Sequence, residues 1–600
     1  MINLATLRII ASLSVVLFAT PGTFAASETD DPAVFAPKDA LAFVGVADMD
    51  KFIADFAGTG IGRIFGDRAA AAAFGEVKDA QAMYDDWRGR IARAIGVDPA
   101  QMKWPLGGSC AAFVYRMQGE AGGGELFLGY GVTLGVRDAA TAREYYAKLT
   151  TNLKTIAVRS DSVTSGADQI DFFMLTAPEF DELDDLEALL TEPTLADAAS
   201  IAAKLSGWRS VALCLREDRL FAGDSAETVR AMLKRDPADS LASQKDYSEI
   251  DRILGKSAGL RLLLNVPRGL AIAREMEPQG TKELETLLGA SCLRSLIGVV
   301  EFGGEKFDAR LEFVALMEGA RAGLAKVLSM PNAKTAAIGD APADALYVVE
   351  YRIDPAAAFR DLERAIAEVS QATDDLRMTV MTESGEVLHV RDDLINALRS
   401  PQRLVISAPP SNEPERARAS LTIAHGDAKK LEKWLAYLRE VAPLTDREAA
   451  GTTVYDLPFN ASLAILKDRV VLGTSEAVDA LAEPTSGNSL ADSPEFRRAI
   501  EVAPAETSMV SFEDTGRLMR TCAAIGAEAG ALPTLFLQKP AIGSVYYAAT
   551  MGFTGAVGPG FKDKVEPWAA LCGPQISTAA TTPEGIRIST FLLKPARKSE

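Results

Sequence analysis

Residues 36–44 read Ala-Pro-Lys-Asp-Ala-Leu-Ala-Phe-Val, and residues 341–349 repeat the phrase as Ala-Pro-Ala-Asp-Ala-Leu-Tyr-Val-Val. In both copies the apolar run has the length of a buried strand, and an Asp and then a Phe follow it. These residues are Asp48 and Phe52 in the first copy, and Asp354 and Phe359 in the second. An Asp in that place is typical of a helix N-cap. The repeat therefore predicts two copies of one α+β unit.

Other phrases recur in the same order. They are residues 213–225 with 463–475, Ser240-Leu241-Ala242 with Ser489-Leu490-Ala491, and residues from 304 with 585–591. In the strand that precedes the first of these pairs we align Asp171 with Asp456. The repeated letters are mostly turn and cap residues, which shape a backbone and supply no nucleophile.

The predicted fold class is α+β, with two tandem pseudo-equivalent halves, each a mainly antiparallel β-sheet covered by helices. The predicted segments are a signal peptide (1–25), a leader (26–35), the first half (36–316), a helix and linker (317–340), the second half (341–593) and a C-terminal tail (594–600). About 35 residues of the first half and about 31 of the second lack a counterpart in this alignment. They fall in insertions near 177–208 and 527–575, where a role specific to one half could lie.

The N-terminal residues have the pattern of a secretory signal. Arg8 is the only charged residue before the apolar run Ile9–Ala19, which is too short to span a membrane. Small residues up to Ala25 predict cleavage after that position. No Cys follows the run, so no lipid anchor is expected. We expect an exported protein, periplasmic or extracellular, with no integral membrane span in the mature chain.

The chain is acidic, with a net charge of −19 at pH 7. This charge disfavours nucleic acid and anionic membrane surfaces as partners, because both need clustered Lys and Arg. With 600 residues, of which 48% are apolar, the chain can build extensive cores.

The repeated phrases, together with residues 353–359 (Ile-Asp-Pro-Ala-Ala-Ala-Phe), resemble a family of exported bacterial proteins known only as a domain of unknown function. The resemblance covers most of residues 36–593. It implies export and the duplicated α+β plan. It implies no catalytic or ligand-binding residue.

One short pattern matches a nucleophile motif. Residues 255–259 (Gly-Lys-Ser-Ala-Gly) have the G-x-S-x-G spacing of a hydrolase elbow, which needs a strand before the Ser and a helix after it. Here a helix is predicted before Ser257 and a strand after it, and the second half has no Ser at the corresponding place. We interpret the segment as a connecting turn.

The chain has only two histidines, His389 and His425, and no pattern supplies either with a nucleophile and an orienting carboxylate. Two lone His also make a zinc site improbable. The cysteines are Cys110, Cys214, Cys292, Cys522 and Cys572. They form no C-x-x-C, and we interpret most of them as buried small hydrophobes. A disulfide between Cys522 and Cys572 is left open.

Three further stretches carry candidate chemistry. The densest acidic cluster comprises Glu179, Asp181, Glu182, Asp184, Asp185 and Glu187. It lacks the D-x-D-x-D-G calcium loop, so we interpret it as a solvated helix start. The glycine-rich residues 58–62 and 122–124 lack phosphate-binding spacing. The uncharged residues 541–561 predict two short strands around a glycine-rich turn, with an apolar binding or membrane-touching loop as the alternative.

These patterns assign no catalytic, cofactor-binding or metal-binding residue, and no cofactor. We therefore expect a non-enzymatic cell-envelope protein with a binding or scaffold role, whose partner is an unknown envelope protein or small ligand. One alternative is an envelope glycan or ester hydrolase with scattered carboxylates. The other is a carrier of apolar ligands or lipids that uses residues 541–561.

Overall fold

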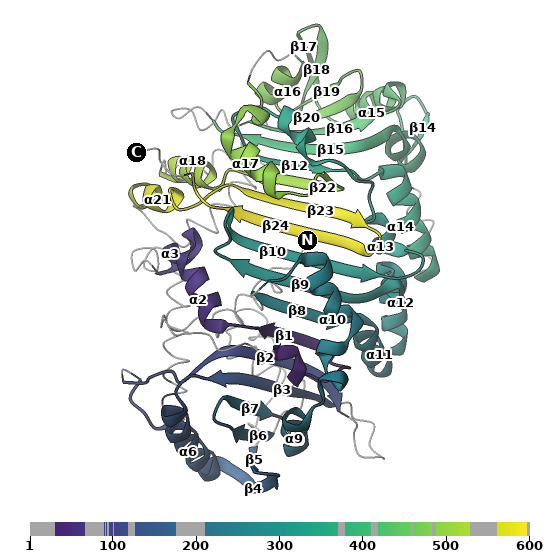
Figure 1. Cartoon of the computed structure of the whole chain (residues 1–600). Coiled ribbons are helices and arrows are strands. Elements are labelled where there is room, and N and C mark those ends of the chain that lie inside the picture. Colours follow the sequence, from purple (N-terminus) through teal and green to yellow (C-terminus); the bar gives the residue numbers. More distant parts are fainter. Residues whose placement is uncertain are drawn as a thin grey trace. The chain divides into compact units, whose positions relative to one another are not determined.

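The computed structural model is shown in Figure 1, coloured along the chain. The residues that it describes are 31–66, 89, 92, 95–99, 101–117, 127–175, 210–257, 259–369, 378–409, 418–457, 461–482, 488–527 and 561–596. Contacts group them into two compact units, each with helices and an antiparallel sheet. The first unit holds the described residues within 1–57, 76–272 and 295–302, and the second holds those within 58–75, 273–294 and 303–600. The predicted α+β class is therefore confirmed.

The sheet of the first unit is antiparallel at every described pairing. Its strands are β1 (Ala42–Val46), β2 (Leu106–Met117), β3 (Phe127–Val136), β4 (Ala157–Ser165), β5 (Asp168–Leu175), β6 (Ser210–Leu215), β7 (Arg219–Gly223), β8 (Leu260–Asn265) and β9 (Leu293–Phe302). They lie side by side in the order β4-β5-β6-β7-β3-β2-β1-β8-β9.

Helices of the first unit follow their strands where the sequence places caps. They are α2 (Met49–Gly58), α6 (Ala139–Ile156), α9 (Ala226–Lys234), α10 (Lys245–Glu249) and α11 (Val266–Met276). The Asp138 carboxylate accepts the backbone N–H groups of Ala140 and Thr141 at the start of α6. The Ser225 hydroxyl accepts the N–H of Thr228 at the start of α9. Both caps satisfy donors that a helix start leaves unpaired.

The sheet of the second unit has strands β10 (Phe307–Met317), β12 (Ala345–Tyr351), β15 (Leu398–Ser407), β16 (Arg418–His425), β17 (Thr445–Ala449), β18 (Thr452–Leu457), β19 (Ala461–Ile465), β20 (Arg469–Thr474), β22 (Met509–Glu513), β23 (Gln575–Thr582) and β24 (Gly585–Leu593). They lie in the order β17-β18-β19-β20-β16-β15-β12-β22-β23-β24-β10, all antiparallel. Two small ribbons accompany this sheet: β11 (Ala333–Lys334) with β21 (Glu506–Thr507), and β13 (Thr379–Met381) with β14 (Val387–His389).

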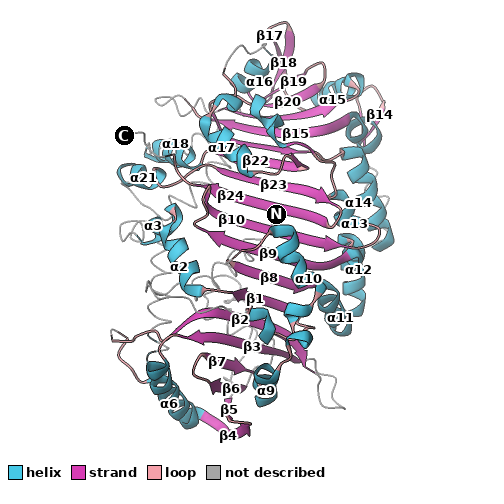
Figure 2. Cartoon of the chain, viewed as in Figure 1, coloured by secondary structure: helices cyan, strands magenta, loops and turns pink. Residues whose placement is uncertain are grey.

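The helices of the second unit are α3 (Gly60–Gly66), α12 (Pro278–Leu288), α13 (Gly323–Val327), α14 (Pro355–Val369), α15 (Ala428–Val441), α16 (Ser475–Ala482), α17 (Pro494–Val502), α18 (Thr515–Ala527) and α21 (Phe561–Ala569). In Figure 2, α14 and α18 lie at opposite ends of the strands of this unit. The reason is that α14 follows β12 and α18 follows β22, and these two strands are antiparallel neighbours. Among the described residues, no helix combines the length and apolarity needed to cross a membrane.

The phrases that the sequence repeats contact one another within each unit. In the first unit the N–H of Leu241 donates to the carbonyl of Ala36 at 2.9 Å. In the second unit the N–H of Leu490 donates to the carbonyl of Ala341 at 2.7 Å. Leu241 and Leu490 are both fully buried. The two phrases thus form the same local contact twice.

Strand registers agree between the two sheets residue by residue. Phe43 pairs with Phe113 and Leu263 in the first sheet, while Val348 pairs with Val405 and Phe512 in the second. These are counterparts under one alignment: β1, β2 and β8 correspond to β12, β15 and β22. The same alignment extends strand by strand from β3 and β16 to the outermost strand of each sheet, which is β4 in the first and β17 in the second.

The register also corrects one part of the sequence alignment. Asp171 pairs with Leu213, and the counterpart of Leu213 is Leu463, which pairs with Tyr455. Aligning Asp171 with Asp456 is therefore wrong by one residue. A shift of one residue places a side chain on the other face of a sheet. Ile170 and its true counterpart Val454 are both fully buried, as the corrected alignment requires.

Candidate functional site

A cavity of about 760 Å³ lies in the first unit, at the outer end of its sheet. Three segments enclose it: helix α6, the turn between β4 and β5, and the turn between β6 and β7. Its polar lining includes Arg143, Tyr146, Lys154, Asp168, Asp171 and Arg216.

Helix α6 directs consecutive tyrosines to different environments. Tyr145 is buried in a cluster with Ala92, Ile95 and Met102. The Tyr146 hydroxyl lies 2.8 Å from a carboxylate oxygen of Asp171 and 3.0 Å from the carbonyl of Leu213. Tyr146 thereby joins the helix to strands β5 and β6 at the cavity wall.

Asp171 is only 5% exposed and its carboxylate is well supplied with donors. Ser162 donates at 2.6 Å and Gln169 at 2.9 Å, in addition to Tyr146. Burial raises the pKa of Asp171, but these hydrogen bonds outweigh it, so that the pKa lies below its usual range. Burial and the bond to Asp171 raise the pKa of Tyr146. The carboxylate therefore stays ionised and the phenol neutral.

Arg216 and Asp168 form a bidentate ion pair at the two turns. The guanidinium Nε lies 2.9 Å from one carboxylate oxygen and a terminal nitrogen lies 2.7 Å from the other. The hydrogen bonds from Arg216 lower the pKa of Asp168. Nearer the rim, Arg143 of α6 contacts Glu217 at 3.2 Å, and both side chains are largely exposed.

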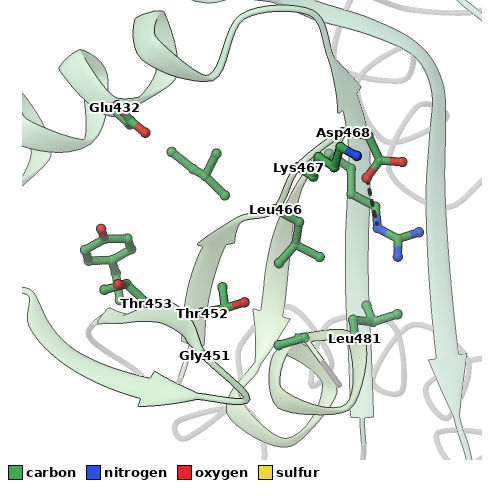
Figure 3. Close-up of a pocket in the computed structure, with 12 residues that line it drawn as sticks. Glu432, Gly451, Thr452, Thr453, Leu466, Lys467, Asp468 and Leu481 are labelled. Atoms are coloured by element: carbon green, nitrogen blue, oxygen red, sulfur yellow. Dashed lines mark ion pairs between the residues drawn. The ribbon is translucent and has the colours of Figure 1, made fainter. Parts of the chain in front are cut away.

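A cavity of about 640 Å³ lies in the second unit. Figure 3 shows Glu432 of α15 on one side of it, across from Thr452 and Leu466. Lys467 and Asp468 occupy the β19–β20 turn, and the Asp468 carboxylate lies 3.9 Å from the Arg469 guanidinium. Thr452 follows the tight turn at Ala450 and Gly451, which both have positive φ.

The two cavities occupy the same place in their units. Under the register alignment the lining pairs are Arg143 with Glu432, Ala167 with Gly451, Asp168 with Thr452, Gln169 with Thr453, Asp171 with Tyr455, Leu215 with Ile465, Arg216 with Leu466, Glu217 with Lys467, and Asp218 with Asp468. The position is shared while the side chains differ. In particular, the rim charges Arg143 and Glu217 are reversed in Glu432 and Lys467.

The sequence candidates lie elsewhere. Ser257 is buried, and its Oγ accepts the N–H of Gly259 at 3.0 Å, in a turn between the helical segment ending at Leu254 and strand β8. His389 is exposed on β14. The His425 Nε2 lies 2.9 Å from the carbonyl of Leu466, which lines the second cavity. Ser257 belongs to the first unit, and both histidines belong to the second.

The cysteines behave as small hydrophobes where they are described. Cys110, Cys214 and Cys292 are buried, and Cys572 is a free thiol. Burial raises the pKa of Cys110 to about 12, and that of Cys214 and Cys572 to about 11. These thiols therefore lack the thiolate character of a nucleophile.

Within the described ranges, no group of three or more His, Cys, Asp or Glu residues could hold a metal ion. The signal peptide, the acidic cluster at 179–187, the turn at 122–124 and the stretch 541–560 lie outside the described residues. Residues 60–62 begin α3, where the N–H of Gly60 donates to Asp308 at 2.7 Å.

Sequence reasoning missed the cavities although it found their turns. The aligned segments Glu217-Asp218-Arg219 and Lys467-Asp468-Arg469 were assigned to backbone shaping alone. Both segments form hairpin turns, yet Glu217 and Asp218 also line the first cavity, and Lys467, Asp468 and Arg469 line the second. The available signal was the reversal of charge at aligned exposed positions.

Comparison with protein-family models, with curated proteins and with solved structures gave no match. The resemblance to exported proteins of unknown function stays a prediction.

Proposed function

We propose that this chain is an exported, non-enzymatic binding protein of the cell envelope with two sites for small polar ligands. In this proposal the halves 36–316 and 341–593 arose by duplication, and each contributes one cavity. The ligand occupies the space between the long helix (α6 or α15) and the two hairpin turns.

The proposed duplication draws support from the sheets. Strand order agrees between the units, and so does each compared register, from β8 and β22 to β5 and β18. Unrelated sheets of this length have no reason to share every register. The repeated contact of Ala36 with Leu241 and of Ala341 with Leu490 points the same way.

One observation carries the proposed function: equivalent positions line a cavity in both units, and their side chains have diverged. Both volumes fall within the range of about 300–1,000 Å³ that is typical of ligand pockets. Polar side chains on a shared scaffold are how related sites acquire different ligands.

The pKa values of the carboxyl groups in the first cavity favour binding over hydrolysis. A glycosidase needs one carboxyl group whose pKa is raised, so that it can donate a proton. In the first cavity the pKa values of Asp168 and Asp171 are instead lowered. Both carboxylates have donors already in place, which suits recognition rather than proton transfer.

A stability screen tests the proposal. Full-length protein is heated with a library of polar compounds, and those that raise the melting temperature are kept. Ala167→Trp fills the first cavity and Thr452→Trp fills the second, so each variant should lose the response to the ligand of its own cavity. Glu305→Trp, in the exposed turn between β9 and β10, is the matched control and should respond like the parent protein.

Two outcomes would contradict the proposal. One is a library in which no compound stabilises the parent protein. The other is a stabilising compound whose effect survives both cavity-filling substitutions. Turnover of a compound by the parent protein and its loss in either variant would instead support the hydrolase alternative.

A further inference from the structure

The first cavity has charges of opposite sign on its two sides. Arg143 and Lys154 project from α6, whereas Glu217 and Asp218 lie on the β6–β7 turn. Arg216 and Asp168 neutralise each other through their bidentate ion pair, and Arg143 and Glu217 through theirs at 3.2 Å. The charges that remain are Lys154 on the helix side, which is positive, and Asp218 on the turn side, which is negative.

The second cavity has the opposite arrangement. Glu432 gives the helix side a negative charge, and Lys467 gives the turn side a positive one. Asp468 and Arg469 lie within ion-pair distance of each other. Within the part of the chain that the structure describes, Glu432 and Lys467 form no ion pair with each other or with another side chain. Both are exposed and free to meet a ligand.

Resting on the proposed function, we propose that both cavities bind zwitterionic ligands, such as short peptides with free termini, and hold them in opposite directions. A ligand with one charge only would satisfy one side of either cavity and face a like charge or nothing on the other. A ligand with an ammonium group at one end and a carboxylate at the other matches both sides. Matching of this kind gives specificity as well as affinity.

The direction of binding follows from the sign of the helix side. In the first unit the ligand carboxylate lies toward Lys154, and its ammonium group toward Asp218. In the second unit the ammonium group lies toward Glu432 and the carboxylate toward Lys467.

Four forms of one peptide test the proposal: trialanine, N-acetyl-trialanine, trialanine amide, and the doubly capped peptide. Each is titrated into full-length protein at low salt, because salt screens exposed charges. Calorimetry uses the Ala167→Trp protein, in which the first cavity is filled, so that the measured heat reports binding to the second cavity. Trialanine should bind at least about fivefold more tightly than either singly charged form, since two charge-assisted contacts are replaced by one.

Charge exchange in the same background tests the direction. Glu432→Lys places two positive groups across the cavity and should weaken trialanine binding about tenfold. Glu432→Lys combined with Lys467→Glu restores one charge of each sign and should recover binding to within about twofold. Glu506→Lys makes the same charge change on exposed β21, outside the cavity, and should leave binding unchanged.

The outcomes separate this inference from the proposed function. Equal binding of all four peptides, or no recovery in the doubly exchanged protein, would overturn the inference and leave the cavity a ligand site. Absence of trialanine binding at about 10 mM, a very weak limit, would also overturn it. The proposed function fails separately, if no compound in the stability screen depends on either cavity.

Discussion

At the scale of single residues, a fully buried carboxylate on β10 is held by partners on β24. Glu312 is 0% exposed and accepts hydrogen bonds from the hydroxyl of Ser589 at 2.6 Å and from Arg587. Arg310 of its own strand completes the set. Burial raises the pKa of Glu312, but Ser589, Arg587 and Arg310 outweigh it, and the pKa lies below its usual range.

Glu312→Gln should lower the free energy of unfolding of the second unit by about 3 kcal/mol, because it leaves the half-buried guanidinium groups of Arg310 and Arg587 without a counter-charge. Urea unfolding of the full chain measures the loss. Glu318→Gln removes a carboxylate that is 77% exposed and lies 3.7 Å from Arg294. It should cost less than about 0.5 kcal/mol. Equal effects of the two substitutions would contradict this account of Glu312.

The pH dependence of stability in acid should report the ionisation of Glu312. A group whose pKa is lowered by folding stabilises the native state above its unfolded pKa, and that stabilisation is lost as pH falls through the native pKa. The stability of the parent protein should therefore fall more steeply below pH 4.5 than that of Glu312→Gln. Parallel pH curves from unfolding midpoints would show that folding does not lower the pKa of Glu312.

A backbone position beside the second cavity offers another test at this scale. Ala450 has φ +48° in the turn between β17 and β18, a region that costs a residue with a Cβ about 1 kcal/mol. Ala450→Gly should therefore raise the free energy of unfolding by about 0.5 kcal/mol, after the entropy that Gly adds to the unfolded chain is subtracted. A loss of stability in urea would show that the turn is not strained.

At the scale of elements, the phrase repeated in the sequence and the Ser-Leu-Ala segment work as partners. Leu241→Ala and Leu490→Ala each remove a buried side chain at the same contact, one in each unit. Each should lower the free energy of unfolding by about 3 kcal/mol, with both losses alike. Leu264→Ala and Leu472→Ala, at leucines that are 40% and 39% exposed, are the controls and should cost less than about 1 kcal/mol. Losses that differ by more than about 2 kcal/mol between Leu241 and Leu490 would argue against equivalent construction.

Helices and strands were the features best predicted from the sequence, because caps and turns have local sequence patterns. The caps predicted at Asp48 and Asp354 form, because their carboxylates accept the backbone N–H groups of Lys51 and Ala357, each at 3.0 Å. Alignment of β5 with β18 failed by one residue, because two aspartates looked alike and only strand pairing reveals the face on which each lies. The cavities themselves could not be predicted, since they need three segments brought together by the sheet, and the charge reversal at aligned positions marks only one of those segments.

At the scale of the whole molecule, we propose that two equivalent cavities serve as ligand sites. Leu215 and Ile465 occupy matching positions in their walls. Leu284, Leu324 and Leu362, on α12, α13 and α14, are exposed and lie outside both cavities. These three exposed leucines therefore serve as controls for binding outside the cavities.

Methyl NMR of the full-length protein, titrated with the stabilising compounds of the screen, locates where those compounds bind. We expect saturable shifts of the Leu215 or Ile465 methyl signals, with Leu284, Leu324 and Leu362 unmoved. Saturable shifts of those three leucines, with Leu215 and Ile465 unchanged, would contradict the proposal.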